Sequence, residues 1–138
     1  MSPMLFANAL RDNKPIKVFN NGDMLRDFTY IDDIVEGTIC AVDYELKAED
    51  CHNGVAYRIY NIGCGHPVRL MDFINEIEQA YGKKAEKEFL PMQPGDVYQT
   101  YADTTRLECD MGYRPHWSLK DGIGEFMKWY KSKTNPMG

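Results

Sequence analysis

The sequence predicts a mixed α/β fold of helices and short strands, in one continuous piece covering residues 1–138. Three observations support this class. Apolar side chains recur at helical spacing over 70–81, and Gly82 then supplies a stop. Short runs rich in aromatic and β-branched residues, at 16–19 and 57–62, are typical of strands. The two patterns alternate along a chain of common domain size.

The other elements follow from local patterns of the same kind. Ser2 before a proline, Asp103, and Ser118 with Asp121 are residues that cap the amino ends of helices. The helices predicted in this way cover 2–11, 33–44, about 103–112 and a segment from 118, further strands cover 27–31 and 87–90, and loops cover 45–56 and 91–96.

Residues 26–37 combine several signals in a short stretch. The predicted strand 27–31 runs into a capping box in which Asp33 and Glu36 would satisfy N–H groups at the start of a helix. The helix is apolar on more than one side, so it requires partners on two faces. Arg26 stands where a loop enters the strand. Its planar guanidinium suits a phosphate or carboxylate, or it is a surface arginine paired with a neighbouring aspartate.

Composition and charge argue against several classes of function. The net charge is −5 and no basic stripe appears, which disfavours binding to nucleic acid or to an anionic membrane. No apolar run approaches the roughly 20 residues of a membrane span. The four cysteines and three histidines show no metal-ligand spacing, so we expect no metal site. Free thiols indicate a reducing compartment, and we expect the cytoplasm.

No catalytic machinery is evident from the residues alone. Gly63 and Gly65 lie between a predicted strand and a helix, where they imitate a dinucleotide-binding loop. Pro67 and Val68 depart from that fingerprint, because the first removes an N–H and the second is bulky. A turn that needs two glycines is favoured, and the cofactor loop stays an alternative. No tyrosine has a lysine four residues later, so the Tyr-x-x-x-Lys pair is absent.

Taken together, five motifs resemble the carboxy-terminal part of the NAD-dependent nucleotide-sugar epimerases. These enzymes belong to the extended short-chain dehydrogenase/reductase group, and the UDP-glucuronate 4-epimerases are the most similar members. The resemblance covers essentially the whole chain. The motifs are Lys-Pro-Ile-Lys-Val-Phe-Asn-Asn-Gly (14–22), Arg-Asp-Phe-Thr-Tyr-Ile-Asp-Asp-Ile-Val (26–35), Tyr-Asn-Ile-Gly (60–63), Leu-Pro-Met-Gln-Pro-Gly-Asp-Val (90–97) and Tyr-Ala-Asp-Thr (101–104).

The resemblance implies a substrate-binding part that lacks the amino-terminal Rossmann domain. In the family, NAD is bound by that domain, which also carries the glycine-rich loop and the Tyr-x-x-x-Lys pair. We therefore expect no cofactor bound to this chain alone. The resemblance matches 60–63 to a late strand–helix unit and not to the NAD loop. It implies that 32–82 packs beside the cofactor domain. It also implies that the surface exposed by the absence of that domain could form an interface between two copies of the chain.

Four positions match substrate-side residues of the family. The resemblance implies that Phe19 flanks the uracil, that Arg26 contacts the ribose–phosphate region, and that Asp96 accepts from ribose hydroxyls. Gln93 is a departure, since the galactose-type epimerases place an arginine on the diphosphate there. Glutamine donates a hydrogen bond without bringing charge, so diphosphate binding would depend more on Arg26.

The function implied is to hold a UDP-sugar for 4-epimerisation by a complete enzyme, while the isolated chain is inactive. Three alternatives stay open. The parent could be a dehydratase, decarboxylase or reductase on the same scaffold. The chain could be a binding module without a catalytic partner. It could also be an assembly piece, in which helix 33–44 finds its partner in another chain.

Overall fold

The computed structural model describes residues 3–136, which divide into two compact units. Unit 1 comprises the chain up to Arg26, Pro67–Thr100, and the chain from Ser118 onward. Unit 2 comprises Asp27–His66 and Tyr101–Trp117. The chain passes between the units four times, so neither unit is one contiguous stretch of sequence.

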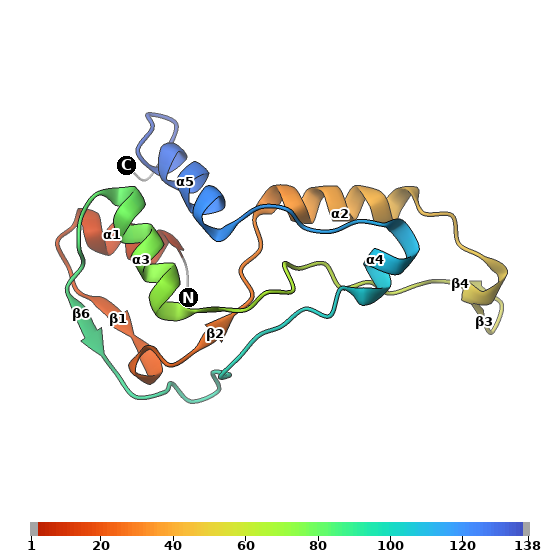
Figure 1. The fold of residues 1–138 in the computed structure, drawn as a ribbon, viewed down its shortest axis with the longest axis horizontal. Helices are drawn as coiled ribbons and strands as arrows, with labels where there is room; N and C mark the ends of the chain where they lie inside the picture. Colours follow the sequence, from red (N-terminus) through yellow and green to blue (C-terminus); the bar gives the residue numbers. More distant parts are fainter. Residues whose placement is uncertain (1–2, 137–138) are drawn as a thin grey trace. The chain divides into compact units, whose positions relative to one another are not determined.

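Unit 1 is built around helix α3, which packs against α1 and α5 (Figure 1). Its buried face consists of Leu70, Phe73, Ile74 and Ile77, and the Phe73 ring lies 6.0 Å from that of Phe6. Strands β1 and β6 pair in parallel and β2 pairs antiparallel with β5. The elements are α1 (Pro3–Arg11), β1 (Ile16–Val18), the 3₁₀ turn η1 (Phe19–Gly22), β2 (Leu25–Arg26), β5 (Val68–Arg69), α3 (Leu70–Tyr81), β6 (Lys87–Phe89) and α5 (Leu119–Tyr130).

Unit 2 is built around helix α2, which packs against α4. Gly37 of this helix is buried, and an added Cβ would lie 2.9 Å from Ile62 and 3.0 Å from the Tyr113 ring. Unit 2 also contains a 3₁₀ turn and a short antiparallel hairpin. The bounds are α2 (Ile31–Asp43), the 3₁₀ turn η2 (Ala48–Asp50), β3 (Cys51–His52), β4 (Val55–Ala56) and α4 (Thr105–Met111).

Several sequence predictions are confirmed. The first helix ends at Arg11 as predicted, although Ser2, its predicted cap, lies outside the described residues. Helix α3 spans the predicted range and ends at Gly82 in the left-handed conformation. The Ser118 side chain accepts from the Asp121 N–H at the start of α5. Strands β1 and β6 each end one residue earlier than predicted.

The prediction for the start of α2 is wrong in two respects. Residues 27–30 form no strand, and the helix begins at Ile31. Asp33 and Glu36 form no capping box. The Asp33 carboxylate instead accepts from the N–H groups of His116 and Trp117, at 3.0 and 3.2 Å. These backbone donors lie more than 80 residues away in the sequence, and they occupy the carboxylate that a cap would use.

The middle of unit 2 also differs from prediction. No strand forms over 57–62, where the Tyr60 hydroxyl donates to Asp110 at 3.0 Å. The strands lie instead in the predicted loop 45–56, where Asn53 and Gly54 take the two positive φ angles of a tight hairpin. Thr104 directly precedes α4, but the Asp103 carboxylate accepts from the Thr105 N–H at 3.1 Å, so the prediction that Asp103 caps this helix is confirmed in its contact. The helix stops at Gly112 as predicted.

Helix α2 keeps one face without a partner among the described residues. Ile31, Val35, Ile39 and Val42 are 47–77% exposed, and their spacing places them along one side of the helix. The expectation that this helix needs two partners therefore stays a prediction. No helix of residues 3–136 is both long enough and apolar enough to cross a membrane.

Candidate nucleotide-binding site

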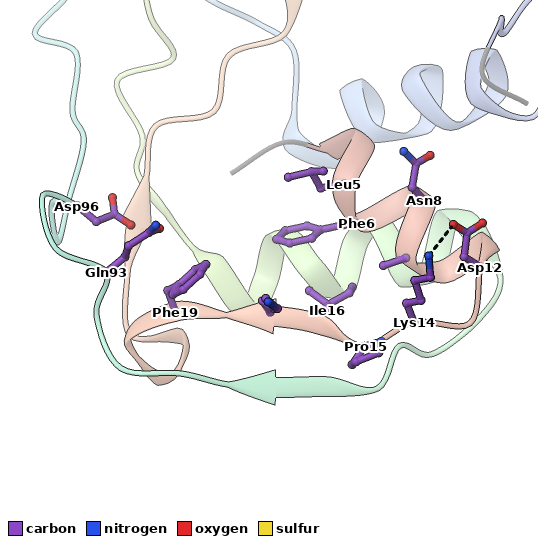
Figure 2. Close-up of a pocket in the computed structure, with 12 residues that line it drawn as sticks. Leu5, Phe6, Asn8, Asp12, Lys14, Pro15, Ile16, Phe19, Gln93 and Asp96 are labelled. Atoms are coloured by element: carbon purple, nitrogen blue, oxygen red, sulfur yellow. Dashed lines mark ion pairs between the residues drawn. The ribbon is translucent and has the colours of Figure 1, made fainter.

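Unit 1 contains a pocket of about 490 Å³ between helix α1, strand β1 and the turn 93–96 (Figure 2). Its walls are apolar on the helix side and polar at the turn. The lining residues are Leu5, Phe6, Asn8, Ala9, Asp12, Lys14, Pro15, Ile16, Lys17, Phe19, Gln93 and Asp96. Three of the four predicted substrate residues, Phe19, Gln93 and Asp96, thus line one pocket.

Phe19 is positioned by the sharp end of β1. The strand stops at Val18, and Asn20 and Asn21 then take positive φ angles that reverse the chain. Asparagine tolerates this conformation better than most residues. The half-buried phenyl ring is therefore held at one end of the pocket, where it offers an apolar surface to a flat ring.

Gln93 and Asp96 belong to one tight turn. The Asp96 N–H donates to the Gln93 carbonyl at 3.1 Å, and Gly95 supplies the left-handed residue with φ of +83°. The Asp96 carboxylate also accepts from the N–H of Val97 at 3.0 Å. Figure 2 shows both side chains at the same end of the pocket as Phe19.

Arg26 does not line the pocket but is joined to it through Asp96. Its guanidinium Nη2 lies 2.8 Å from Asp96 Oδ1, and its side chain is 12% exposed. Nη1 donates to the carbonyls of Leu25 and Tyr98 at 2.7 and 3.0 Å. Three of the five N–H donors of a guanidinium are thereby engaged. The structure therefore contains an arginine–aspartate pair, as one of the two interpretations of Arg26 predicted. The aspartate of this pair, Asp96, lines the pocket.

Charged groups from β1 and from the loop between α1 and β1 complete the pocket. Lys14 and Lys17 line it, and Lys14 Nζ lies 3.7 Å from Asp12 Oδ2 (Figure 2). Sequence reasoning missed these residues although both lie in the motif 14–22, because only Phe19 of that motif was matched to a substrate position. The alternation of β1, with Lys17 exposed between two buried residues, is the signal that could have indicated Lys17.

The glycine pair at 63 and 65 has a structural explanation. Gly65 has a φ of +69°, and an added Cβ at Gly63 would lie 2.4 Å from that of Ala102. The Gly65 N–H, a donor that a phosphate would require, instead donates to the Asp27 carboxylate at 3.0 Å. The prediction of a turn that needs two glycines for its backbone geometry is confirmed for Gly65, whereas Gly63 is required by close packing against Ala102.

Comparison with known proteins supports the family resemblance of the five motifs. Residues 1–63 match the NAD dependent epimerase/dehydratase family. Protein CapI of Staphylococcus aureus is 40% identical over 94% of this chain and 42% of its own length. A probable UDP-glucuronate 4-epimerase of Rhizobium meliloti is 36% identical over 94% of this chain and 41% of its own. The resemblance to the nucleotide-sugar epimerases is confirmed.

Solved structures confirm the fold of this epimerase-like chain. UDP-glucuronic acid 4-epimerase from Bacillus cereus, in complex with UDP-glucuronic acid and NAD, superposes with a TM-score of 0.77 at 31% identity. The match covers 93% of this chain and 40% of that one. UDP-glucose 4-epimerase from Bifidobacterium longum, at 23% identity and a TM-score of 0.80, shares the fold. The chain therefore has the extended short-chain dehydrogenase/reductase fold over about two-fifths of its relatives' length.

Proposed function

We propose that this chain is the UDP-sugar-binding part of an NAD-dependent 4-epimerase of the UDP-glucuronate type. One observation carries the proposal: Phe19, Gln93 and Asp96 line a single pocket, and Arg26 is bonded to Asp96. A flat apolar ring, an acceptor for hydroxyls and a nearby cation are the chemistry that a nucleoside diphosphate requires. The names of the similar enzymes support the choice of sugar.

Each residue has a distinct role in this proposal. Phe19 packs against the uracil ring, and Asp96 accepts from ribose hydroxyls. Arg26 turns its remaining N–H donors to the diphosphate, to which Gln93 adds an uncharged donor. Because the nucleotide is held firmly, the sugar can turn to present either face without leaving the site. The binding energy of the nucleotide is thus used to position the sugar. NAD, bound by another part of the complete enzyme, would supply hydride transfer at C4 of the sugar.

The Arg26–Asp96 pair prepares both side chains for the nucleotide. Each partner is held in place before the ligand arrives, so less side-chain freedom is lost on binding. The pair is mostly buried, which limits its screening by salt. An anion near Nη2 then adds to the contacts of the guanidinium without any large movement of Asp96.

Calorimetry with UDP tests the role of Arg26. The chain should bind UDP, and Arg26→Ala should weaken binding about tenfold or more, because a charge-assisted hydrogen bond contributes roughly 1.5–3 kcal/mol. Arg69→Ala, on the neighbouring strand β5, is the matched control and should bind as the wild type does. Equal affinity in Arg26→Ala and the wild type would rule out Arg26 as the phosphate contact.

We also infer that 32–82 packs beside the dinucleotide-binding domain of the complete protein. The exposed apolar side of α2, formed by Ile31, Val35, Ile39 and Val42, supports this inference. Amide hydrogen exchange in α2 should be slower in the complete protein than in this chain. Equal exchange rates would contradict the packing. All four cysteines are free thiols, which supports the expected cytoplasmic setting.

A further inference from the structure

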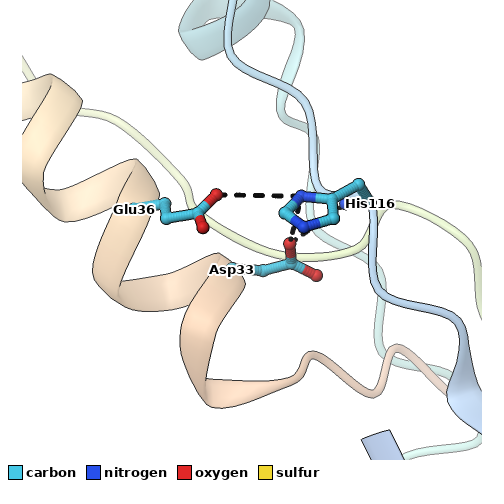
Figure 3. Close-up of side chains that lie close together, drawn as sticks. All are labelled: Asp33, Glu36 and His116. Carbon is cyan, nitrogen blue, oxygen red and sulfur yellow. Dashed lines mark hydrogen bonds and ion pairs between the residues drawn. The ribbon is translucent and has the colours of Figure 1, made fainter. Parts of the chain in front are cut away.

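Three side chains with metal-binding atoms converge beside α2 in unit 2 (Figure 3). Asp33 and Glu36 stand one helical turn apart, so their carboxylates share a face of the helix. His116 reaches them from the segment that follows α4. Its Nδ1 lies 3.3 Å from Asp33 Oδ1 and 3.7 Å from Glu36 Oε2. One ligand atom from each residue lies within 4.8 Å of the other two.

These spacings are close to those around a bound transition metal. Zn²⁺ holds nitrogen and oxygen ligands at about 2.0–2.1 Å in a tetrahedron, which places neighbouring ligand atoms roughly 3.3 Å apart. The two measured distances from Nδ1 are near this value. Only the Glu36 carboxylate would have to move inward, and its exposed side chain can rotate to do so.

Asp33 is already fixed in the orientation of a ligand. Its side chain is 1% exposed, and its carboxylate accepts from the N–H groups of His116 and Trp117. The Tyr113 hydroxyl donates to the Asp33 carbonyl at 2.6 Å and holds the same turn of helix. Oδ1 accepts from the His116 N–H and also lies 3.4 Å from the Tyr113 hydroxyl. That hydroxyl has a single proton, which is directed to the nearer Asp33 carbonyl, so a lone pair of Oδ1 is left for a cation. Such outer contacts are the usual support of metal ligands.

Charge and access also favour a cation here. Within the part of the chain that the structure describes, the ion pairs of Asp33 and Glu36 are both with His116. Two carboxylates thus lie beside a single imidazole, and a divalent cation would balance their negative charge. The side chains of Glu36 and His116 are 49% and 60% exposed, so an ion can enter from solvent.

We propose that Asp33, Glu36 and His116 form a binding site for a divalent transition metal, with Zn²⁺ as the best match. An imidazole with two carboxylates suits zinc, whereas magnesium and calcium prefer ligand sets made of oxygen alone. The fourth position would be open to water. The ion would fasten the segment carrying His116 to the first turns of α2, and it would stabilise unit 2.

Zinc titration of the reduced chain by calorimetry tests the site. The wild type should bind one Zn²⁺ at this site, and Glu36→Gln and His116→Gln should each weaken that binding at least about tenfold. Both substitutions change exposed side chains, so we expect the fold to be retained. His66→Gln removes an exposed imidazole outside the cluster and is the matched control, in which zinc binding should be unchanged.

A second measurement separates this site from zinc held by cysteines. Zn²⁺ should raise the thermal midpoint of the wild type and of His66→Gln, but not that of Glu36→Gln or His116→Gln. Two results would overturn the proposal. One is the absence of zinc binding by the wild type. The other is binding of equal affinity in the two cluster variants, which would leave the cluster as a plain ion pair.

Discussion

At the scale of single residues, Gly63 shows how close packing can require a glycine without any unusual backbone angle. An added Cβ there would lie 2.4 Å from Ala102 Cβ, well inside contact distance. Gly63→Ala should therefore destabilise the chain by about 1–3 kcal/mol, as overpacking does elsewhere. Urea denaturation measures the difference.

The chain offers two informative comparisons for this substitution. Gly124 lies inside α5 with open space around it, so Gly124→Ala should be neutral or stabilising by up to about 1 kcal/mol. Adding Ala102→Gly to Gly63→Ala removes the clash and should restore part of the lost stability. If Gly63→Ala and Gly124→Ala behave alike, the packing argument fails.

At the scale of elements, one carboxylate joins the end of α3 to the segment that leads into β6. Glu78 is almost fully buried and binds Lys84, Lys87 and the N–H of Ala85. Burial alone would raise the pKa of Glu78, but these hydrogen bonds outweigh it and hold the pKa below its ordinary value. The ionised side chain is therefore part of the folded structure.

This shift predicts how stability depends on pH. A carboxyl group whose pKa is lower in the folded state stabilises fully above the unfolded pKa of about 4.3, and less as pH falls through the folded pKa. Glu78→Gln should therefore lower the free energy of unfolding at pH 7. Below about pH 4.3 the stability of this variant should fall less steeply with pH than that of the wild type. Urea denaturation between pH 7 and pH values below about 4.3 measures both effects. Glu76→Gln, on the same helix, should retain the acid dependence of the wild type. An unchanged profile in Glu78→Gln would contradict the assignment.

Sequence patterns predicted the elements whose cause is local. Helix α3 follows from its own apolar spacing, and α5 from its Ser118 cap. The failures have distant causes. The hydrogen bond between Asp33 and Trp117 could not be predicted from local sequence, because 84 residues separate the two. Residues 57–62 have the composition of a strand, but no neighbouring strand pairs with them.

The candidate site was predictable only in part for the same reason. Chemistry alone pointed to Arg26, whereas its partner Asp96 is 70 residues away in a polar turn without a distinctive pattern. The family resemblance supplied Asp96, Phe19 and Gln93, and their roles toward the nucleotide stay predictions. The cluster at His116 was missed because its ligands lie in separate segments.

At the scale of the whole molecule, the sequence predicts the activity of the isolated chain. The sequence contains neither a glycine-rich NAD loop nor a Tyr-x-x-x-Lys pair. The isolated chain should therefore neither bind NAD in a thermal-shift assay nor convert UDP-glucuronate, followed by product analysis. Binding of UDP by the same preparation serves as the control that the chain is folded. Turnover by the purified chain would refute this expectation.

The four passages of the chain between the units have a consequence for synthesis in the cell. The core of unit 1 needs α5 to cover α3, and unit 2 needs α4 to cover α2. Neither unit can close until residues beyond Tyr101 have left the ribosome. The apolar faces of α2 and α3 are synthesised first and stay uncovered until α4 and α5 follow. During this period chaperones would be the main protection of the nascent chain from aggregation.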